Sequence, residues 1–296
     1  MFLNIDCLIE LAERVDQDDI LQFSLISRIF YSAGKRAQRK LITKFSSIIT
    51  SIKKIEHAIL NFEDEEFEEN IGYMAIRNGN LAVLNWCEKT ELWPDNILAC
   101  ELAAENGHLH VLKWLRKRKC PWSKETCDMA AKNGHLECLK WARENDCEWS
   151  IWTCARAAGN GHFECLKWAV NNKCPIDMNS TYEAVFGGHL EILKYLSSVF
   201  SPTDWNQDWN FYVINTIATA EGHLEILKYF KETYNCHLRP ILQNSAVKNG
   251  QLDVFIWLTE KMGLVNYEFY YDLAEMHNQT EIMSYIRYLF PNLLFR

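Results

Sequence analysis

The 296-residue sequence lacks the features that mark several large classes of protein. No apolar run approaches the about 18 residues of a membrane-spanning helix, so we expect no membrane association. No Cys-x-x-Cys pair occurs among the 11 cysteines, and equivalent positions in stacked helices lie about 8–10 Å apart, which argues against a zinc site. An acid stands where a signal peptide needs a basic region, so we expect reduced thiols and a cytoplasmic location.

Catalytic and nucleic-acid-binding signatures are also missing. Gly159-Asn160-Gly161 begins like a dinucleotide-binding loop, but it ends a predicted helix instead of following a strand, and residue 164 is Glu. The net charge of −8 argues against broad contact with a phosphate backbone. The basic residues of segment 28–54 lack interleaved aromatic residues and adjoin an acidic run, which favours a linker over a nucleic-acid site. We therefore expect a protein that is not an enzyme and needs neither cofactor nor metal.

What the sequence does contain is an internal repeat. A glycine recurs in steps of 27 or 28 residues, except for one step of 34 residues after Gly188, and a column of aromatic residues keeps the same steps. The glycines are Gly79, Gly107, Gly134, Gly161, Gly188, Gly222 and Gly250, and Asn278 holds the eighth place. The aromatic residues are Trp86, Trp114, Trp141, Trp168, Tyr195, Tyr229, Trp257 and Tyr285. This period is typical of a solenoid whose small units bury their apolar faces against one another.

Each unit is predicted to be a pair of helices. An N-cap residue is expected 11 residues before the repeat glycine, at Ser123, Ser150 and Asp177. The first helix then ends at Asn-Gly, because a left-handed backbone costs least for Gly or Asn. The second helix, around Trp141, carries a wide apolar arc, so we expect it to pack on its partner and on both neighbours. The histidines after the glycines are expected to bond the backbone: His108, His135, His162, His189 and His223.

These residues resemble ankyrin repeats. The run Ala-Ala-x-Asn-Gly-His-Leu-Glu-x-Leu-Lys-Trp around Gly134 matches the two-helix unit of that family, and Lys-Cys-Pro-Trp-Ser at 119–123 resembles a divergent variety abundant in giant DNA viruses. The usual Thr-Pro-Leu-His opening is absent, and the unit is about six residues shorter than the family's 33, which implies a truncated or absent hairpin finger. The resemblance implies an all-α solenoid of about eight short ankyrin-like helix-turn-helix repeats over residues 71–296, acting as a monomer that binds a protein partner on its concave face.

Ankyrin-like units meet their partners mainly through the start of the first helix and the residues before the turn glycine. The equivalent positions in this sequence are identified by their distance from the turn glycine. On this basis the resemblance implies a capture surface at Lys124, Glu125, Lys132, Asn133, Ile151, Trp152, Asn160, Met178 and Asn179. Trp152 is the strongest candidate, because its equivalents Glu125 and Asn179 are polar. The alternative is that Trp152 fills space left by the missing opening motif.

The long step adds about seven residues around 197–210, which we expect to form an inserted loop containing Trp205 and Trp209. Loops tolerate insertions, so this segment is either a neutral addition or, because Trp is enriched at binding hot spots, a further contact site.

Residues 1–40 are predicted to form a helical hairpin that resembles an F-box. A polar break at 16–19 precedes the pair Ile20-Leu21, and 25–31 reads Leu-Ile-Ser-Arg-Ile-Phe-Tyr, although Asn4-Ile5 replaces the usual Leu-Pro. An F-box docks to the linker subunit of a cullin-RING ubiquitin ligase, which implies docking through Ile5, Leu8, Ile9, Ile20 and Leu21. Residues 41–70 would then form a linker with a capping helix and an acidic segment.

Together the two resemblances imply a substrate-recruiting adaptor of a ubiquitin ligase, in the host cytoplasm if the protein is viral. Two alternatives stay open. The hairpin could serve only as a helical cap of the solenoid, and the array could be a scaffold or a sequestering inhibitor with no link to ubiquitin.

Overall fold

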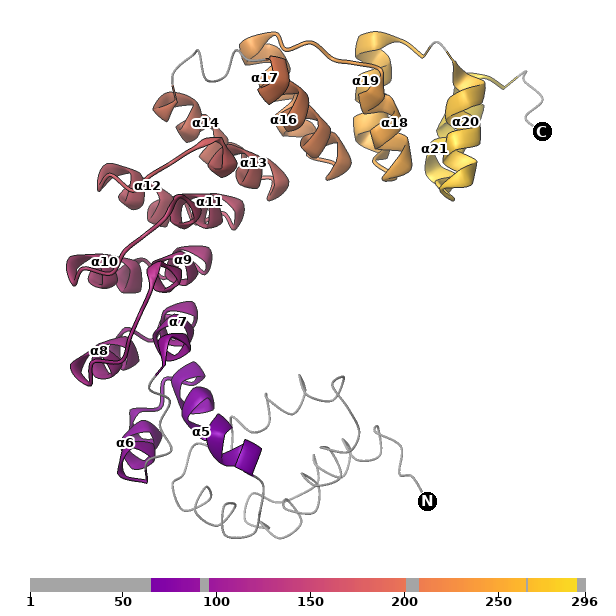
Figure 1. Ribbon diagram of the computed structural model, residues 1–296. Helices are drawn as coiled ribbons and strands as arrows, with labels where there is room; N and C mark the ends of the chain where they lie inside the picture. The colour runs from indigo at the N-terminus through magenta and orange to yellow at the C-terminus, as the bar shows by residue number, and fades with distance from the viewer. Residues whose placement is uncertain (1–64, 91–95, 201–207, 265, 292–296) are drawn as a thin grey trace, which may run out of the picture. The chain divides into compact units, whose positions relative to one another are not determined.

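A computed structural model describes residues 65–90, 96–200, 208–264 and 266–291 (Figure 1). In these ranges the chain forms sixteen helices and no strand. The predicted fold class, an all-α solenoid of short ankyrin-like repeats, is confirmed. The N-terminal hairpin with its docking residues, and Trp205, lie outside the described residues.

The chain divides into two units, and the first comprises residues 1–130 with 135–148. Its helices are α5 (Glu65–Arg77), α6 (Leu81–Lys89), α7 (Ile97–Glu105), α8 (Leu109–Lys117), most of α9 (Lys124–Lys132) and α10 (Leu136–Glu144). Helix α5 packs on α6 and α7, α7 packs on α8, and α8 packs on α10. The first helix of the described residues, α5, includes part of the predicted acidic segment.

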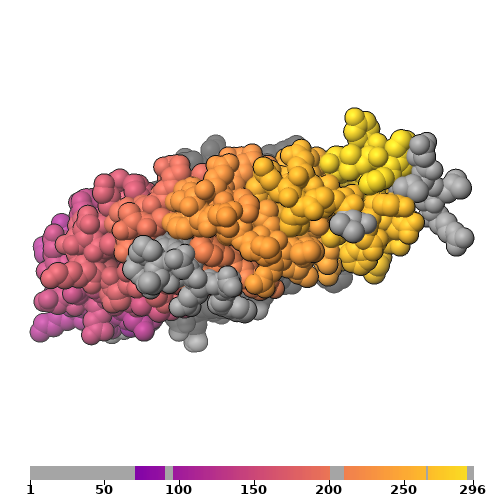
Figure 2. Space-filling model, turned by 90° about the horizontal axis from the view of Figure 1, so that it is seen from above, coloured from indigo at the N-terminus to yellow at the C-terminus, as the bar shows by residue number. Residues whose placement is uncertain are grey.

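The second unit comprises residues 131–134 with 149–296. Its helices are α11 (Ile151–Gly159), α12 (Phe163–Asn171), α13 (Met178–Phe186), α14 (Leu190–Val199), α16 (Asp208–Ala220), α17 (Leu224–Tyr234), α18 (Ile241–Lys248), α19 (Leu252–Met262), α20 (Tyr267–Met276) and α21 (Thr280–Leu289). The first helices α11, α13, α16, α18 and α20 pack on one another in that order, and each also packs on the second helix that follows it. The unit thus has two layers, and its later repeats follow one another in chain order from orange to yellow in Figure 2.

The turn between the two helices of a repeat has the predicted backbone. All seven repeat glycines have positive φ, between 69° and 80°, and Asn278 has a φ of 58°. These values fall in the left-handed region of backbone conformation. The free-energy cost of this conformation is lowest for glycine, which has no Cβ, and for asparagine. The glycine column therefore marks where each first helix stops.

The predicted N-caps are also confirmed. The hydroxyl of Ser150 accepts from the backbone N–H of Trp152, and the N–H of Ser150 in turn reaches the Thr153 hydroxyl at 3.1 Å, which completes a capping box. Asp177 caps α13, and the hydroxyl of Ser123 accepts from the Glu125 N–H at 3.1 Å. Each cap satisfies a backbone donor that the first turn of a helix leaves unpaired.

The placement of the aromatic column on the buried arc is wrong for most of its members. In α10 the fully covered side chains are Cys138, Leu139 and Ala142, whereas Trp141 is half-buried. The indole of Trp141 meets the ring of Trp122 edge-on at 5.9 Å. The indole of Trp141 is therefore only partly covered, while smaller side chains of the same helix are fully covered.

The insertion also departs from the prediction. Helices α14 and α16 have 10 and 13 residues, while the first helix α11 has nine, so part of the insertion lengthens existing helices. Trp209 belongs to α16 and not to a loop, and that assignment is wrong.

The cysteines form small packing elements, as predicted from their repeated spacing. All ten described cysteines are buried, and none of them forms a disulfide bond. The thiols of Cys120 and Cys147 donate to backbone carbonyls of Asn96 and Ser123, both at 3.2 Å. No helix in the described ranges is long and apolar enough to cross a membrane.

Candidate functional site

The repeated histidines link successive repeats, as the sequence indicated. Nε2 of His108 lies 2.8 Å from the Arg77 carbonyl oxygen, and Nε2 of His135 lies 3.0 Å from that of Glu105. His189 and His223 make the same bond in the second unit, to Gly159 and Phe186. Each acceptor stands two residues before the glycine of the preceding repeat. This regular contact gives the histidines a structural role, so the functional surface has to be sought elsewhere.

Two glutamines make the same contact with the preceding repeat, which the histidine pattern did not predict. The side-chain amides of Gln251 and Gln279 donate to the carbonyls of Ala220 and Lys248, at 2.9 and 3.4 Å. Both glutamines directly follow the turn residue, at the position that histidine holds in the earlier repeats. Their place in the column was therefore visible in the sequence, but their shared role with histidine was not.

The thiols are poor candidates for nucleophiles. Burial raises the pKa of the Cys87 and Cys138 thiols to about 11. A hydrogen bond with the Cys120 thiol, together with burial, also raises the pKa of Cys100. These three groups stay protonated at neutral pH, and it is the thiolate that attacks electrophiles or binds metals.

The predicted capture residues divide between the two units. In the first unit Lys124 is exposed at the start of α9 and Glu125 is half-buried, where its carboxylate accepts from the Ser123 hydroxyl at 2.5 Å. The second unit holds the others: Lys132, Asn133 and Asn160 are exposed at the ends of first helices, and Ile151, Met178 and Asn179 are half-buried at the starts of α11 and α13.

Trp152 is the most exposed large apolar residue of the predicted set. Its side chain is 44% exposed, while Thr153, Cys154 and Ala155 beside it are fully buried. The first turn of α11 thus turns its packing residues inward and leaves the indole on the surface. This exposure does not fit the alternative in which Trp152 fills space in the core.

Other exposed apolar side chains occupy related places on first helices and were missed. In the second unit Ile241 and Phe269 stand nine residues before their turn residue, as Trp152 does, and are 48% and 44% exposed. Phe186 and Met276 stand two residues before theirs, and both are exposed. In the first unit Leu98 holds the position of Trp152. The apolar residues at the position of Trp152, namely Leu98, Ile241 and Phe269, are visible in the sequence, whereas their exposure is not.

The large apolar side chains exposed on first helices of the second unit, which we call the exposed set, are Trp152, Phe186, Ile241, Phe269 and Met276. Tyr288 and Leu289 are also exposed, but they belong to the second helix α21. All five belong to first helices, so they lie on one layer of the unit. Packing within the repeat does not require an apolar residue at these places, because Asn179 occupies the position of Trp152 in the next repeat.

Comparison with known proteins gives a family match for the centre of the array. Residues 127–170 match the family described as "Ankyrin repeats (many copies)". The matched segment includes Gly134 and Gly161, and it contains Lys132, Asn133, Ile151, Trp152 and Asn160 of the predicted capture surface.

Among solved structures, the crystal structure of the human ASB11 ankyrin repeat domain aligns with 63% of this chain and 96% of that chain, at 16% sequence identity and a TM-score of 0.47. A search of curated proteins found no match.

Proposed function

We propose that this protein is an ankyrin-like interaction module that captures another protein on its layer of first helices. The observation that carries the proposal is the exposed set of the second unit, because large apolar side chains recur there at fixed places that packing leaves free. Covering such side chains supplies the driving force of most protein association. The absence of a catalytic constellation from the sequence is consistent with a binding role.

The size of the effect supports a specific contact surface. Completing the burial of a large apolar side chain stabilises a complex by up to about 1.5–3 kcal/mol, and Trp is the residue most enriched among interface hot spots. The exposed set offers five such side chains around polar neighbours such as Asn160 and Asn179. This is the usual composition of an interface with an apolar centre and a polar rim.

The location of the capture surface can be tested before a natural partner is known. Binders selected from a displayed peptide library against the whole protein would be mapped by hydrogen exchange. We expect protection at the starts of α11, α18 and α20, where Trp152, Ile241 and Phe269 lie. Protection confined to the second helices α12, α19 and α21 would contradict the proposal, since these helices form the other layer.

As a second part of the proposal, residues 1–40 dock the module to the linker subunit of a cullin-RING ubiquitin ligase. The support is the F-box-like sequence with its apolar residues Ile5, Leu8, Ile9, Ile20 and Leu21. A pulldown with the purified linker subunit would compare the wild type with the variants Leu8→Asp and Ile20→Asp. We expect binding by the wild type alone. Failure of the wild type to bind would leave the scaffold or sequestering inhibitor as the function of the array.

A further inference from the structure

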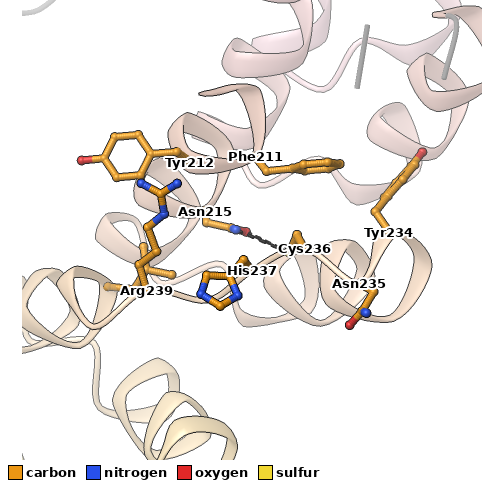
Figure 3. Close-up of a pocket in the computed structure, with 9 residues that line it drawn as sticks. Phe211, Tyr212, Asn215, Tyr234, Asn235, Cys236, His237 and Arg239 are labelled. Carbon is orange, nitrogen blue, oxygen red and sulfur yellow. Dashed lines mark hydrogen bonds between the residues drawn. The ribbon is translucent and has the colours of Figure 1, made fainter. Parts of the chain in front are cut away.

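The second unit contains a cavity of about 260 Å³ beside the start of α16 (Figure 3). In that view the ring of Phe211 lies on one side of the cavity, the segment 235–237 lies on the other, and Asn215 lies between them. The cavity stands next to α18, whose first residue is Ile241 of the exposed set. It therefore adjoins the proposed capture surface.

Asn215 stands at a repeat position that holds a thiol in three earlier repeats and a polar side chain in the repeats on either side of it. The residues seven positions before the turn glycine in three earlier repeats are Cys100, Cys127 and Cys154. Cys100 and Cys127 pack against cysteines 20 residues later, and their thiols approach the backbone oxygens of those residues, Cys120 and Cys147. Thr181 and Gln243 hold this position in the neighbouring repeats and do not line the cavity, whereas Asn215 lines it and faces the corresponding Cys236.

The amide of Asn215 has little to bond with. It is 1% exposed, and among the described residues its partner is the Cys236 sulfur, which lies 3.4 Å from Nδ2 and 3.9 Å from Oδ1. A primary amide offers two donors and an acceptor with two lone pairs, and a thiol is a weak partner for both. One repeat later, the buried Gln243 donates to the Gly263 carbonyl at 3.0 Å and accepts from the Tyr270 hydroxyl at 3.1 Å. Asn215 lacks such oxygen partners, which points to a group that enters the cavity.

The walls of the cavity indicate what that group is. A cavity of about 150 Å³ suffices for a benzene ring, and drug-sized ligands need about 300 Å³ or more. The space at Asn215 therefore suits one substituted ring, and Phe211 offers that ring an aromatic wall. The guanidinium of Arg239 lies 5.4 Å from the ring centre of Tyr212 at the edge of the cavity and has no carboxylate partner in the part of the chain that the structure describes.

We propose that this cavity, the Asn215 pocket, receives a tyrosine side chain of the captured protein, and that an acidic residue next to this tyrosine pairs with Arg239. The inference rests on the proposed capture function and names the chemistry of the partner. The tyrosine hydroxyl both donates and accepts, so it satisfies the buried amide, whereas phenylalanine would leave that amide without an oxygen partner. A nucleobase would also be flat, but the net charge of −8 disfavours a nucleic-acid partner.

The test uses the full chain and three synthetic peptides, acetyl-Glu-Tyr-Glu-amide, its phenylalanine analogue, and acetyl-Lys-Tyr-Lys-amide. Titrations are followed by NMR at the side-chain amide signals of Asn215. We expect the acidic tyrosine peptide to shift these signals and to bind about tenfold more tightly than the phenylalanine analogue, since a buried amide would lose its bond. The lysine-flanked peptide is expected to bind more weakly than the acidic one.

Two variants sharpen the result. Asn215→Cys installs the residue that earlier repeats carry at this position, so it should fold, and it should abolish the preference for tyrosine over phenylalanine. Arg239→Ala, on an exposed side chain, should abolish the preference for acidic over basic flanks. Equal affinities of the wild type for the tyrosine and phenylalanine peptides, or unshifted Asn215 signals, would overturn the proposal.

The pocket and the capture surface can fail separately. The tripeptides probe the cavity alone, because no residue of the exposed set lines it. A failed peptide titration would therefore remove the Asn215 pocket and leave the hydrogen-exchange test of the exposed set standing.

Discussion

The imidazole of His135 lies directly over Gly107 of the preceding repeat. A Cβ added to Gly107 would stand 2.5 Å from Nδ1 of this ring, and Nε2 of the same ring lies 3.0 Å from the Glu105 carbonyl oxygen. The glycine thus has two independent reasons to lack a side chain. Its φ of 72° suits glycine, and the next repeat occupies the space that a Cβ would need.

Gly107→Ala should therefore destabilise the protein by more than the about 1–2 kcal/mol of a left-handed alanine. Urea unfolding would measure the loss in the wild type and in a His135→Ala background. We expect a smaller loss in that background, because removing the ring relieves the clash while the backbone cost remains. The same loss in both backgrounds would mean that the ring does not crowd the glycine.

Substitution of the histidine itself should depend on whether the new side chain can donate. His135→Gln is expected to change stability little, because Gln251 and Gln279 make the same contact in later repeats. His135→Ala should cost about 1–3 kcal/mol, since the Glu105 carbonyl loses a partner. Thermal unfolding of the two variants would compare these costs, and equal losses would assign the effect to packing of the ring instead of the hydrogen bond.

The buried thiols predict a loss of stability at alkaline pH. Burial raises the pKa of Cys138 from 9.0 to about 11, so the folded state holds this proton more tightly than the unfolded state does. The contribution is fully present below pH 9 and is lost as the pH rises toward 11. Urea midpoints measured between pH 8 and 11 should fall less steeply for Cys138→Ala than for the wild type. Parallel curves would show that this thiol does not contribute to the slope.

Leu139→Ala should cost more stability than Trp141→Ala, although it deletes fewer atoms. Leu139 is fully covered, and its removal leaves a cavity that typically costs about 2–5 kcal/mol. Trp141 is half-buried, so part of the volume that it vacates opens to water. Equilibrium unfolding would measure the loss of stability in both variants. A larger loss for Trp141→Ala would mean that the indole belongs to the core.

Local rules made much of the repeat predictable. The turn glycines, the cap at Ser150 and the ends of α9 and α11 follow from backbone preferences and hydrogen bonds within a few residues, which the sequence displays directly. The half-burial of Trp141 depends on how much space neighbouring helices leave. Periodicity reports which side of a helix faces inward but does not report how deeply a side chain is covered.

The candidate sites were less accessible because they depend on neighbouring repeats. Trp152, Ile241 and Phe269 hold equivalent positions in the sequence, but their exposure depends on how the repeats pack. The Asn215 pocket requires knowing that a residue 21 positions later, Cys236, faces the amide. The helix that contains Trp209 arises because an insertion can lengthen an element instead of forming a loop.

The most direct test of the account is the affinity of a selected protein binder for Trp152→Ala. Trp149→Ala serves as the matched control, because Trp149 belongs to the same repeat but meets the ring of Trp168 at 5.9 Å. Calorimetry should show Trp152→Ala weakening the complex by about 2 kcal/mol or more, roughly 30-fold in Kd, with an almost unchanged Tm, and Trp149→Ala lowering the Tm with affinity largely kept. Unchanged affinity with a large fall in Tm for Trp152→Ala would contradict capture by the first-helix layer.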